Sequence, residues 1–124
     1  MKAGRYWIGD LCYVMHEVWD EVCEKTTREN ECLYGEFRLD DGREFVLHST
    51  GGDGEFQDQQ GRRYPVDAGL IGAIRVSDIH NPKAMIDLGY IVEFNSPMES
   101  YKSGDTIVFH GIGTNSTIVR IDCS

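Results

Sequence analysis

The chain has 124 residues, of which 40% are hydrophobic and 27% are charged, a composition typical of one folded domain spanning residues 1–124. Its 12 lysines and arginines stand against 21 aspartates and glutamates, which gives a formal net charge of −9. This balance argues against direct binding to nucleic acid, because phosphate contacts need clustered lysine and arginine, and Arg62–Arg63 is the only adjacent basic pair.

The acidity has two interpretations. It is typical of a solvated surface, and it also fits a protein that binds a partner with a basic face, including an inhibitor that mimics DNA. Four cysteines form no C-x-x-C pair and no zinc-site spacing; they are Cys12, Cys23, Cys32 and Cys123. The amino-terminal stretch lacks an apolar signal core, and no apolar run is long enough for a membrane span. We therefore expect reduced thiols in a cytoplasm.

The amino-terminal part predicts a strand, a second apolar run and one helix. Residues 5–8 favour a strand, because tyrosine, tryptophan and isoleucine suit a half-buried pleated surface, and residues 11–14 continue the apolar character. Residues 16–25 predict an amphipathic helix. Its apolar face consists of Val18, Trp19, Val22 and Cys23. We expect this helix to cover one face or mouth of a sheet through Trp19.

The middle of the chain predicts two hairpins and a buried strand. Residues 34–39 and 44–49 alternate around the turn signal at residues 40–42. Residues 55–57 and 62–67 flank a second turn, and Pro65 predicts an edge strand because proline donates no ladder hydrogen bond. Residues 70–76 are apolar and β-branched, which favours a buried strand.

The carboxyl-terminal part predicts a helix start at Pro82, a strand at residues 90–94 and a polar connection at residues 96–104. Residues 105–110 and 117–122 favour a last hairpin. Many short strands with glycine turns and one helix predict an α+β fold that is mainly β. We expect a strongly bent antiparallel sheet or a small barrel, with the amphipathic helix packed on it.

The segment from residue 49 to residue 74 is the densest in residues that need special backbone angles, so we expect it to build the functional face. The backbone amides of its glycine-rich loop, which includes Gly52, Asp53 and Gly54, can form a nest for an anion. No P-loop lysine follows this loop, and the spacing of its acids does not match a calcium-binding EF-hand. The loop either contacts a ligand or is a mobile hairpin connection.

Three carboxylates beside glycines or at strand ends are Asp10, Asp53 and Asp67. If the strands converge, these side chains line one cleft, where they bind a divalent metal or act as general acid and base. Alternatively, each caps a turn with its own oxygen atoms. His48 and His110 also fall near strand ends.

Two stretches resemble small uncharacterised proteins of phages and bacteria. The first is YWIGDLCYV at residues 6–14, with the pattern G-D-x-C-Y-V. The second is GDGEFQDQQGRRYPVDAGLIG at residues 52–72. The resemblance carries no activity. It implies a phage or bacterial setting, hence the cytoplasm of a bacterial host, and its pattern includes the four positions Asp10, Asp53, Asp58 and Asp67.

Our leading hypothesis is a non-enzymatic module that binds a small polar molecule, such as a nucleotide-type defence signal that a phage protein sequesters from its host. Trp7 or Tyr64 would stack on the ligand. The acidic net charge argues against a multiply phosphorylated ligand unless Arg62, Arg63 or Arg75 faces it. The predicted ligand-binding residues are Trp7, Asp10, Gly52, Asp53, Gly54, Arg62, Tyr64 and Asp67. The alternatives are a metal-assisted hydrolase that uses Asp10, Asp53, Asp67 and His48, and an acidic inhibitor that binds a protein partner.

Overall fold

The computed structural model describes residues 1–29 and 31–124, which form two five-stranded antiparallel sheets and a small two-stranded ribbon. The first sheet has the order β4 (Gly35–Arg38), β5 (Glu44–Ser49), β8 (Leu70–Arg75), β1 (Gly4–Gly9) and β9 (Gly89–Phe94). The second sheet has the order β10 (Met98–Ser103), β11 (Thr106–Gly111), β12 (Ile118–Asp122), β6 (Gly54–Asp58) and β7 (Arg63–Val66). The ribbon consists of β2 (Thr27–Arg28) and β3 (Glu31–Cys32).

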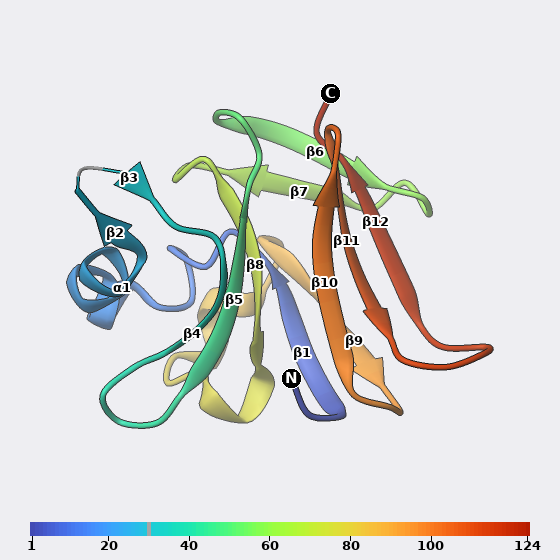
Figure 1. The fold of residues 1–124 in the computed structure, drawn as a ribbon, viewed down its shortest axis with the longest axis horizontal. Coiled ribbons are helices and arrows are strands. Elements are labelled where there is room, and N and C mark those ends of the chain that lie inside the picture. The colour runs from blue at the N-terminus through green and yellow to red at the C-terminus, as the bar shows by residue number, and fades with distance from the viewer. Residues whose placement is uncertain (30) are drawn as a thin grey trace.

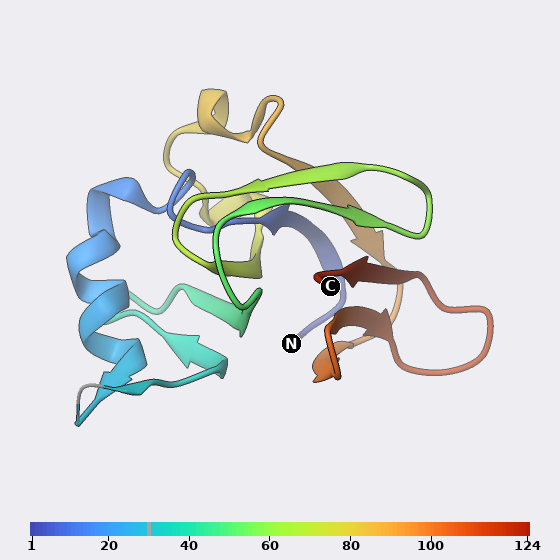
Figure 2. The ribbon, with the colours of Figure 1, turned by 90° about the horizontal axis from the view of Figure 1, so that it is seen from above.

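The helical segments are short. A single turn η1 (His16–Val18) leads into α1 (Trp19–Thr26), and two further 3-10 turns, η2 (Val76–Asp78) and η3 (Pro82–Met85), lie between β8 and β9. The second sheet lies on one side of the first sheet and α1 on the other, while the β6–β7 hairpin crosses one end of the molecule (Figures 1 and 2). No helix among the described residues has the length and apolar character needed to cross a bilayer.

Both faces of the first sheet are buried. On β1, Tyr6 and Ile8 point into the core between the two sheets, where Phe109 and Ile121 of the second sheet meet them. Trp7 points the opposite way, into a second core beneath α1 and the 3-10 turns. This explains why residues 6–8 are continuously apolar rather than alternating.

The second core is built around the turn that follows β1. Leu11, Val14 and Met15 are all buried there, together with Val22 of α1 and Phe45 of β5. Val18 and Trp19 pack against this cluster from the helical side. The expected packing of the helix on the sheet through Trp19 is therefore confirmed, although Cys23 is exposed rather than on the buried face.

Two glycines allow the Trp7 indole to lie flat across neighbouring strands. Gly9 and Gly89 face each other in the β1–β9 register. A Cβ atom on Gly9 would come within 2.5 Å of the indole, and one on Gly89 within 2.4 Å. The glycine of the G-D-x-C-Y-V pattern is thus required by the tryptophan two residues before it.

The mainly β fold class, the helix and most of the strands are confirmed, including the position of Pro65 on the edge strand β7. The sheets do not close into a barrel; they pack as two layers. The connection expected at residues 96–104 is wrong, because Met98–Ser103 forms the edge strand β10. Residues 11–14 form a turn, since Leu11 and Val14 are buried by folding back rather than by pleating.

Candidate functional site

Asp10, at the end of β1, is completely buried and accepts three backbone hydrogen bonds. Its Oδ1 accepts the amide of Cys12 at 3.0 Å, and its Oδ2 accepts the amides of Asp67 at 2.8 Å and Ala68 at 2.7 Å. The carboxylate therefore joins the turn after β1 to the turn between β7 and β8. With these donors already in place, its oxygens serve the fold rather than a ligand.

The other two predicted carboxylates lie near this junction. Asp67 is exposed, and its Oδ2 accepts the Tyr13 hydroxyl at 2.9 Å. Asp53 reaches to within 3.9 Å of where a Cβ on Gly69 would lie. Burial and then the neighbouring carboxylates of Asp10, Asp67 and Asp53 raise the pKa of the Cys12 thiol well above its usual value. The structure thus brings the two predicted turns together.

This convergence does not assemble the proposed hydrolase site. Among the His, Cys, Asp and Glu side chains that the structure describes, no three are arranged to hold a metal ion. His48 lies on β5 and points into the space between the sheets, where its Nε2 is 2.8 Å from the Ser100 hydroxyl. His48 therefore contacts the edge strand β10, whereas Asp10 contacts the turn between β7 and β8.

The glycine-rich loop is exposed but folded on itself. Gly52 and Gly54 have φ angles of +153° and +150°, a region that favours glycine. The Thr50 hydroxyl donates to the Gly52 carbonyl at 2.5 Å, and the Gly51 amide donates to Ser49 Oγ at 3.1 Å. These local hydrogen bonds fix the loop as the entry into β6.

Arg62 and Tyr64 lie at the opposite end of the β6–β7 hairpin from Gly52 and Asp53. Both side chains bind Asp58 Oδ2, at 2.7 Å from Arg62 Nε and 2.7 Å from the Tyr64 hydroxyl. Burial alone would raise the pKa of the Asp58 carboxyl, but the hydrogen bonds from Tyr64 and Arg62 hold it below its usual value. The buried Asp58 carboxylate therefore stabilises the turn between β6 and β7.

The two aromatic rings predicted to stack on a ligand are both core residues. Trp7 has no exposed surface, and its indole N–H donates to the Met85 carbonyl at 3.1 Å. Tyr64 has no exposed surface either and meets the Tyr90 ring edge-on. Neither ring has a face open to a ligand, so the eight predicted residues are divided among a buried core, a turn junction and a hairpin tip.

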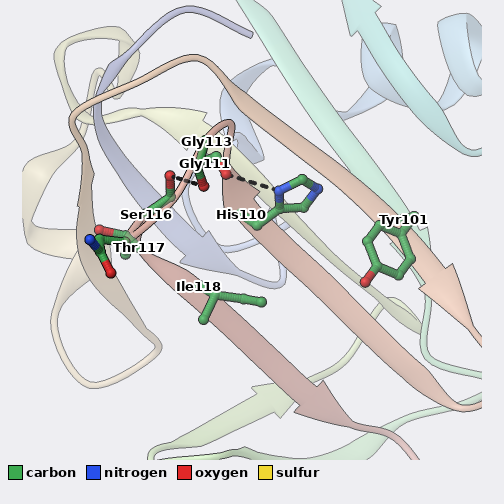
Figure 3. A pocket seen from close by; sticks show the side chains of 8 residues that line it. Tyr101, His110, Gly111, Gly113, Ser116, Thr117 and Ile118 are labelled. Atoms are coloured by element: carbon green, nitrogen blue, oxygen red, sulfur yellow. Dashed lines mark hydrogen bonds between the residues drawn. The ribbon is translucent and has the colours of Figure 1, made fainter.

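A hollow lies on the second sheet, away from the residues that the sequence predicted to bind a ligand. On the outer face of the second sheet, a cavity of about 380 Å³ is lined by Tyr101 of β10 and His110 of β11, and by the start of β12 and the loop that precedes it (Figure 3). Tyr101 and His110 point away from the core because their strand neighbours Ser100 and Phe109 point toward it. Their ring centroids are 5.8 Å apart at an interplanar angle of 67°.

The proton on His110 can be assigned from its contact. Its Nδ1 lies 3.0 Å from the Gly111 carbonyl oxygen, which only accepts hydrogen bonds. Nδ1 is therefore the protonated nitrogen, and in the neutral ring Nε2 is an acceptor. The histidine thus offers a ligand one oriented acceptor beside the Tyr101 ring.

The loop between β11 and β12 forms the other wall. The Ser116 hydroxyl bonds the Gly113 carbonyl at 2.8 Å and lies 3.1 Å from that of Ile112, which holds the loop in a tight bend (Figure 3). Gly111 has no room for a side chain, since a Cβ there would lie 2.7 Å from Ser96 Oγ. A smaller hollow of about 170 Å³ on the loop is lined in part by Asn95 and Ser96.

Tyr101 was missed because the sequence of β10 reads as polar. Met98 and Ser100 point toward the core and Glu99 and Tyr101 point away from it, but Met98 is the only apolar residue on the inward face of β10, so the strand lacks the apolar–polar alternation that predicts a strand. Comparison of the chain with models of known protein families, with curated proteins and with solved structures finds no match.

Proposed function

We propose that the protein is a non-enzymatic module that binds a small polar molecule with a planar ring, in the hollow between Tyr101, His110 and Ser116. The observation that supports this most directly is the pair of outward rings, 5.8 Å apart, beside a cavity of about 380 Å³. Small-molecule sites of this kind combine aromatic surface with a few placed polar groups.

The lining suits a nucleoside-type ligand. Tyr101 and Ile118 supply apolar surface for a ring, and His110 supplies the acceptor Nε2. Asn115 and Thr117 add an amide and a hydroxyl at the loop, suited to sugar hydroxyl groups. In the phage or bacterial setting that the resemblance implies, a protein that binds such a molecule without converting it would sequester a nucleotide-type signal of the host.

Binding rather than catalysis is favoured by the arrangement of Ser116 and His110. The serine hydroxyl bonds loop carbonyls, and no hydrogen bond joins it to the His110 ring. A nucleophilic serine needs a base within hydrogen-bond reach. The site therefore has the parts to hold a ligand but lacks an activated nucleophile.

The test is a binding screen of nucleosides and nucleotides by isothermal titration calorimetry, repeated on Tyr101→Ala and His110→Ala. We expect Tyr101→Ala to weaken binding about tenfold or more, since stacking on a base contributes about 1–3 kcal/mol. Tyr34→Ala is the matched control, because Tyr34 and Tyr101 are both 48% exposed.

Equal weakening by Tyr34→Ala, or no binding of any member of the screen, would contradict the proposal. So would turnover of a bound nucleotide that stops on addition of EDTA, which would instead support the metal-assisted hydrolase. A salt-sensitive complex with a basic protein, without small-molecule binding, would support the acidic inhibitor.

A further inference from the structure

Arg75, the last residue of β8, carries a buried donor that the protein does not satisfy. Among residues 1–29 and 31–124, its Nη2 is the only buried side-chain nitrogen or oxygen without a hydrogen-bond partner. A buried donor left in this state costs about 1–3 kcal/mol. Such an atom in a folded protein calls for an explanation, and an acceptor from outside the chain, a water or an anion, is one.

The other shielded arginines of this acidic chain are paired with carboxylates. Arg43 bonds Asp41 at 2.9 Å, and Arg62 bonds Asp58 at 2.7 Å. Arg75 takes part in none of the ion pairs formed among the described residues. Its guanidinium carbon instead lies 5.9 Å from the centroid of the Tyr6 ring.

The acidic groups around Arg75 do not neutralise it. Glu44 lies beside Arg75 across the β5–β8 pair, because the next residues, Phe45 and Ile74, are paired; its carboxylate forms an ion pair with Arg38 at 3.5 Å. Glu93 is exposed and lies opposite Arg5 in the β1–β9 register, but forms no ion pair with it among the described residues. Arg75 therefore has no carboxylate partner in the ion pairs of the described residues, and its guanidinium interacts with Tyr6 instead.

A hollow of about 350 Å³ adjoins this guanidinium. It is lined by Gly4, Arg5, Arg75, Val76 and Ser77, so two arginines and a serine surround it and no carboxylate residue is part of its lining. Gly4 contributes no side chain, and nothing lies within 4 Å of where its Cβ would be. In a chain with a net charge of −9, two arginines sharing one hollow mark a local positive site.

We infer that this hollow is an anion site, and that it binds the phosphate group of a small molecule. A phosphate oxygen accepts strong charge-assisted hydrogen bonds from the guanidinium fork. Because Nη2 is covered in this structure, binding requires the Arg75 guanidinium to turn toward the hollow and away from the Tyr6 ring. The site shares no lining residue with the Tyr101–His110 hollow, so it stands independently of the proposed function.

The test is an NMR titration of the whole chain with inorganic phosphate at low, constant ionic strength, with chloride as the reference salt. We expect shifts of the backbone amides of Gly4, Arg5, Val76 and Ser77, together with the ring signals of Tyr6. Inorganic phosphate has no ring, so it does not report on Tyr101. Adenosine and adenosine monophosphate as further arms separate recognition of phosphate from recognition of a base.

Arg75→Gln should weaken phosphate binding about tenfold or more, the loss expected for a charge-assisted contact. Since the Arg75 side chain forms no ion pair among the described residues and contacts the Tyr6 ring instead, this variant should change the melting temperature in chloride only slightly. Arg120→Gln is the matched control, because Arg120 is an exposed arginine that lines a different hollow on the second sheet. Equal binding by Arg75→Gln and wild type would overturn the inference, as would shifts that map to Arg120 or are spread over the whole chain.

Discussion

At the scale of single residues, Asp10 shows how a carboxylate that resembles a catalytic group can serve the fold. Its three amide donors come from two turns that are far apart in sequence. The carboxyl group is tolerated in a fully buried position because oriented backbone amides donate to both of its oxygens.

We expect Asp10→Asn to lower the free energy of unfolding by about 2–4 kcal/mol, because the amide cannot accept all three donors. Urea denaturation followed by circular dichroism measures this. Asp53→Asn is the control, since Asp53 is exposed and should change stability by less than about 0.5 kcal/mol. Equal effects of the two substitutions would show that Asp10 is not a structural junction.

His48 makes stability depend on pH. Burial, with a smaller effect of Lys102, lowers the pKa of its imidazole below the usual value, so the folded protein holds it neutral. The unfolded chain binds a proton near pH 6.5, and stability must therefore fall as the pH drops below that value.

We expect the urea midpoint to be lower at pH 5.5 than at pH 7.5, and His48→Gln to reduce this difference. His16→Gln is the control, because His16 is exposed. An unchanged pH dependence in His48→Gln would assign the effect to other groups.

At the scale of elements, the packing of Trp7 on the Gly9–Gly89 pair links β1 to β9. Gly9→Ala should destabilise the protein by about 1–3 kcal/mol, because its Cβ would overlap the indole. Combining it with Trp7→Phe should cost less than the sum of the two changes, whereas combining it with Trp19→Phe should be additive. Thermal unfolding of the three single and two double variants measures this coupling, and additivity in both pairs would contradict the packing.

Most elements were predictable because their signals are local. The alternation and turn at residues 34–49 predicted β4 and β5, and Pro65 predicted an edge. β10 was not predictable with the same rules, because an edge strand that buries few side chains has a polar sequence. Its burial depends on Phe109 and the rest of the second sheet, which local patterns do not describe.

The candidate site shows the same limit. The hypothesis from the sequence was conditional: Asp10, Asp53 and Asp67 would line one cleft if the strands converged. In the structure the turns that carry Asp10 and Asp67 lie together, and the Asp67 amide donates to Asp10 Oδ2 at 2.8 Å. The sequence did not predict that backbone amides would donate hydrogen bonds to the Asp10 carboxylate. These bonds depend on how the turn after β1 lies against the turn between β7 and β8. Tyr101 and His110 are diagonal neighbours on β10 and β11, and their ring contact depends on the register of these strands. The sequence did not predict this register.

At the scale of the whole molecule, the first sheet is shared by both cores, so neither core can be lost alone. Leu11→Ala, in the core beneath α1, and Phe109→Ala, between the sheets, should each lower the unfolding free energy by about 3–5 kcal/mol. Tryptophan fluorescence and far-ultraviolet circular dichroism should report one coincident transition for both variants. Separate transitions would show that the two layers unfold independently.

The central place of β1 has a consequence for how the chain is made. Tyr6 pairs with Arg75 and Gly4 with Phe94, so β1, which is synthesised before β8 and β9, finds its last neighbour only when β9 has emerged from the ribosome. Until then the apolar Tyr6, Trp7 and Ile8 lack their final partners, and a chaperone or another nascent chain can capture them. The duration of this vulnerable period is set by the time needed to translate residues 10–94.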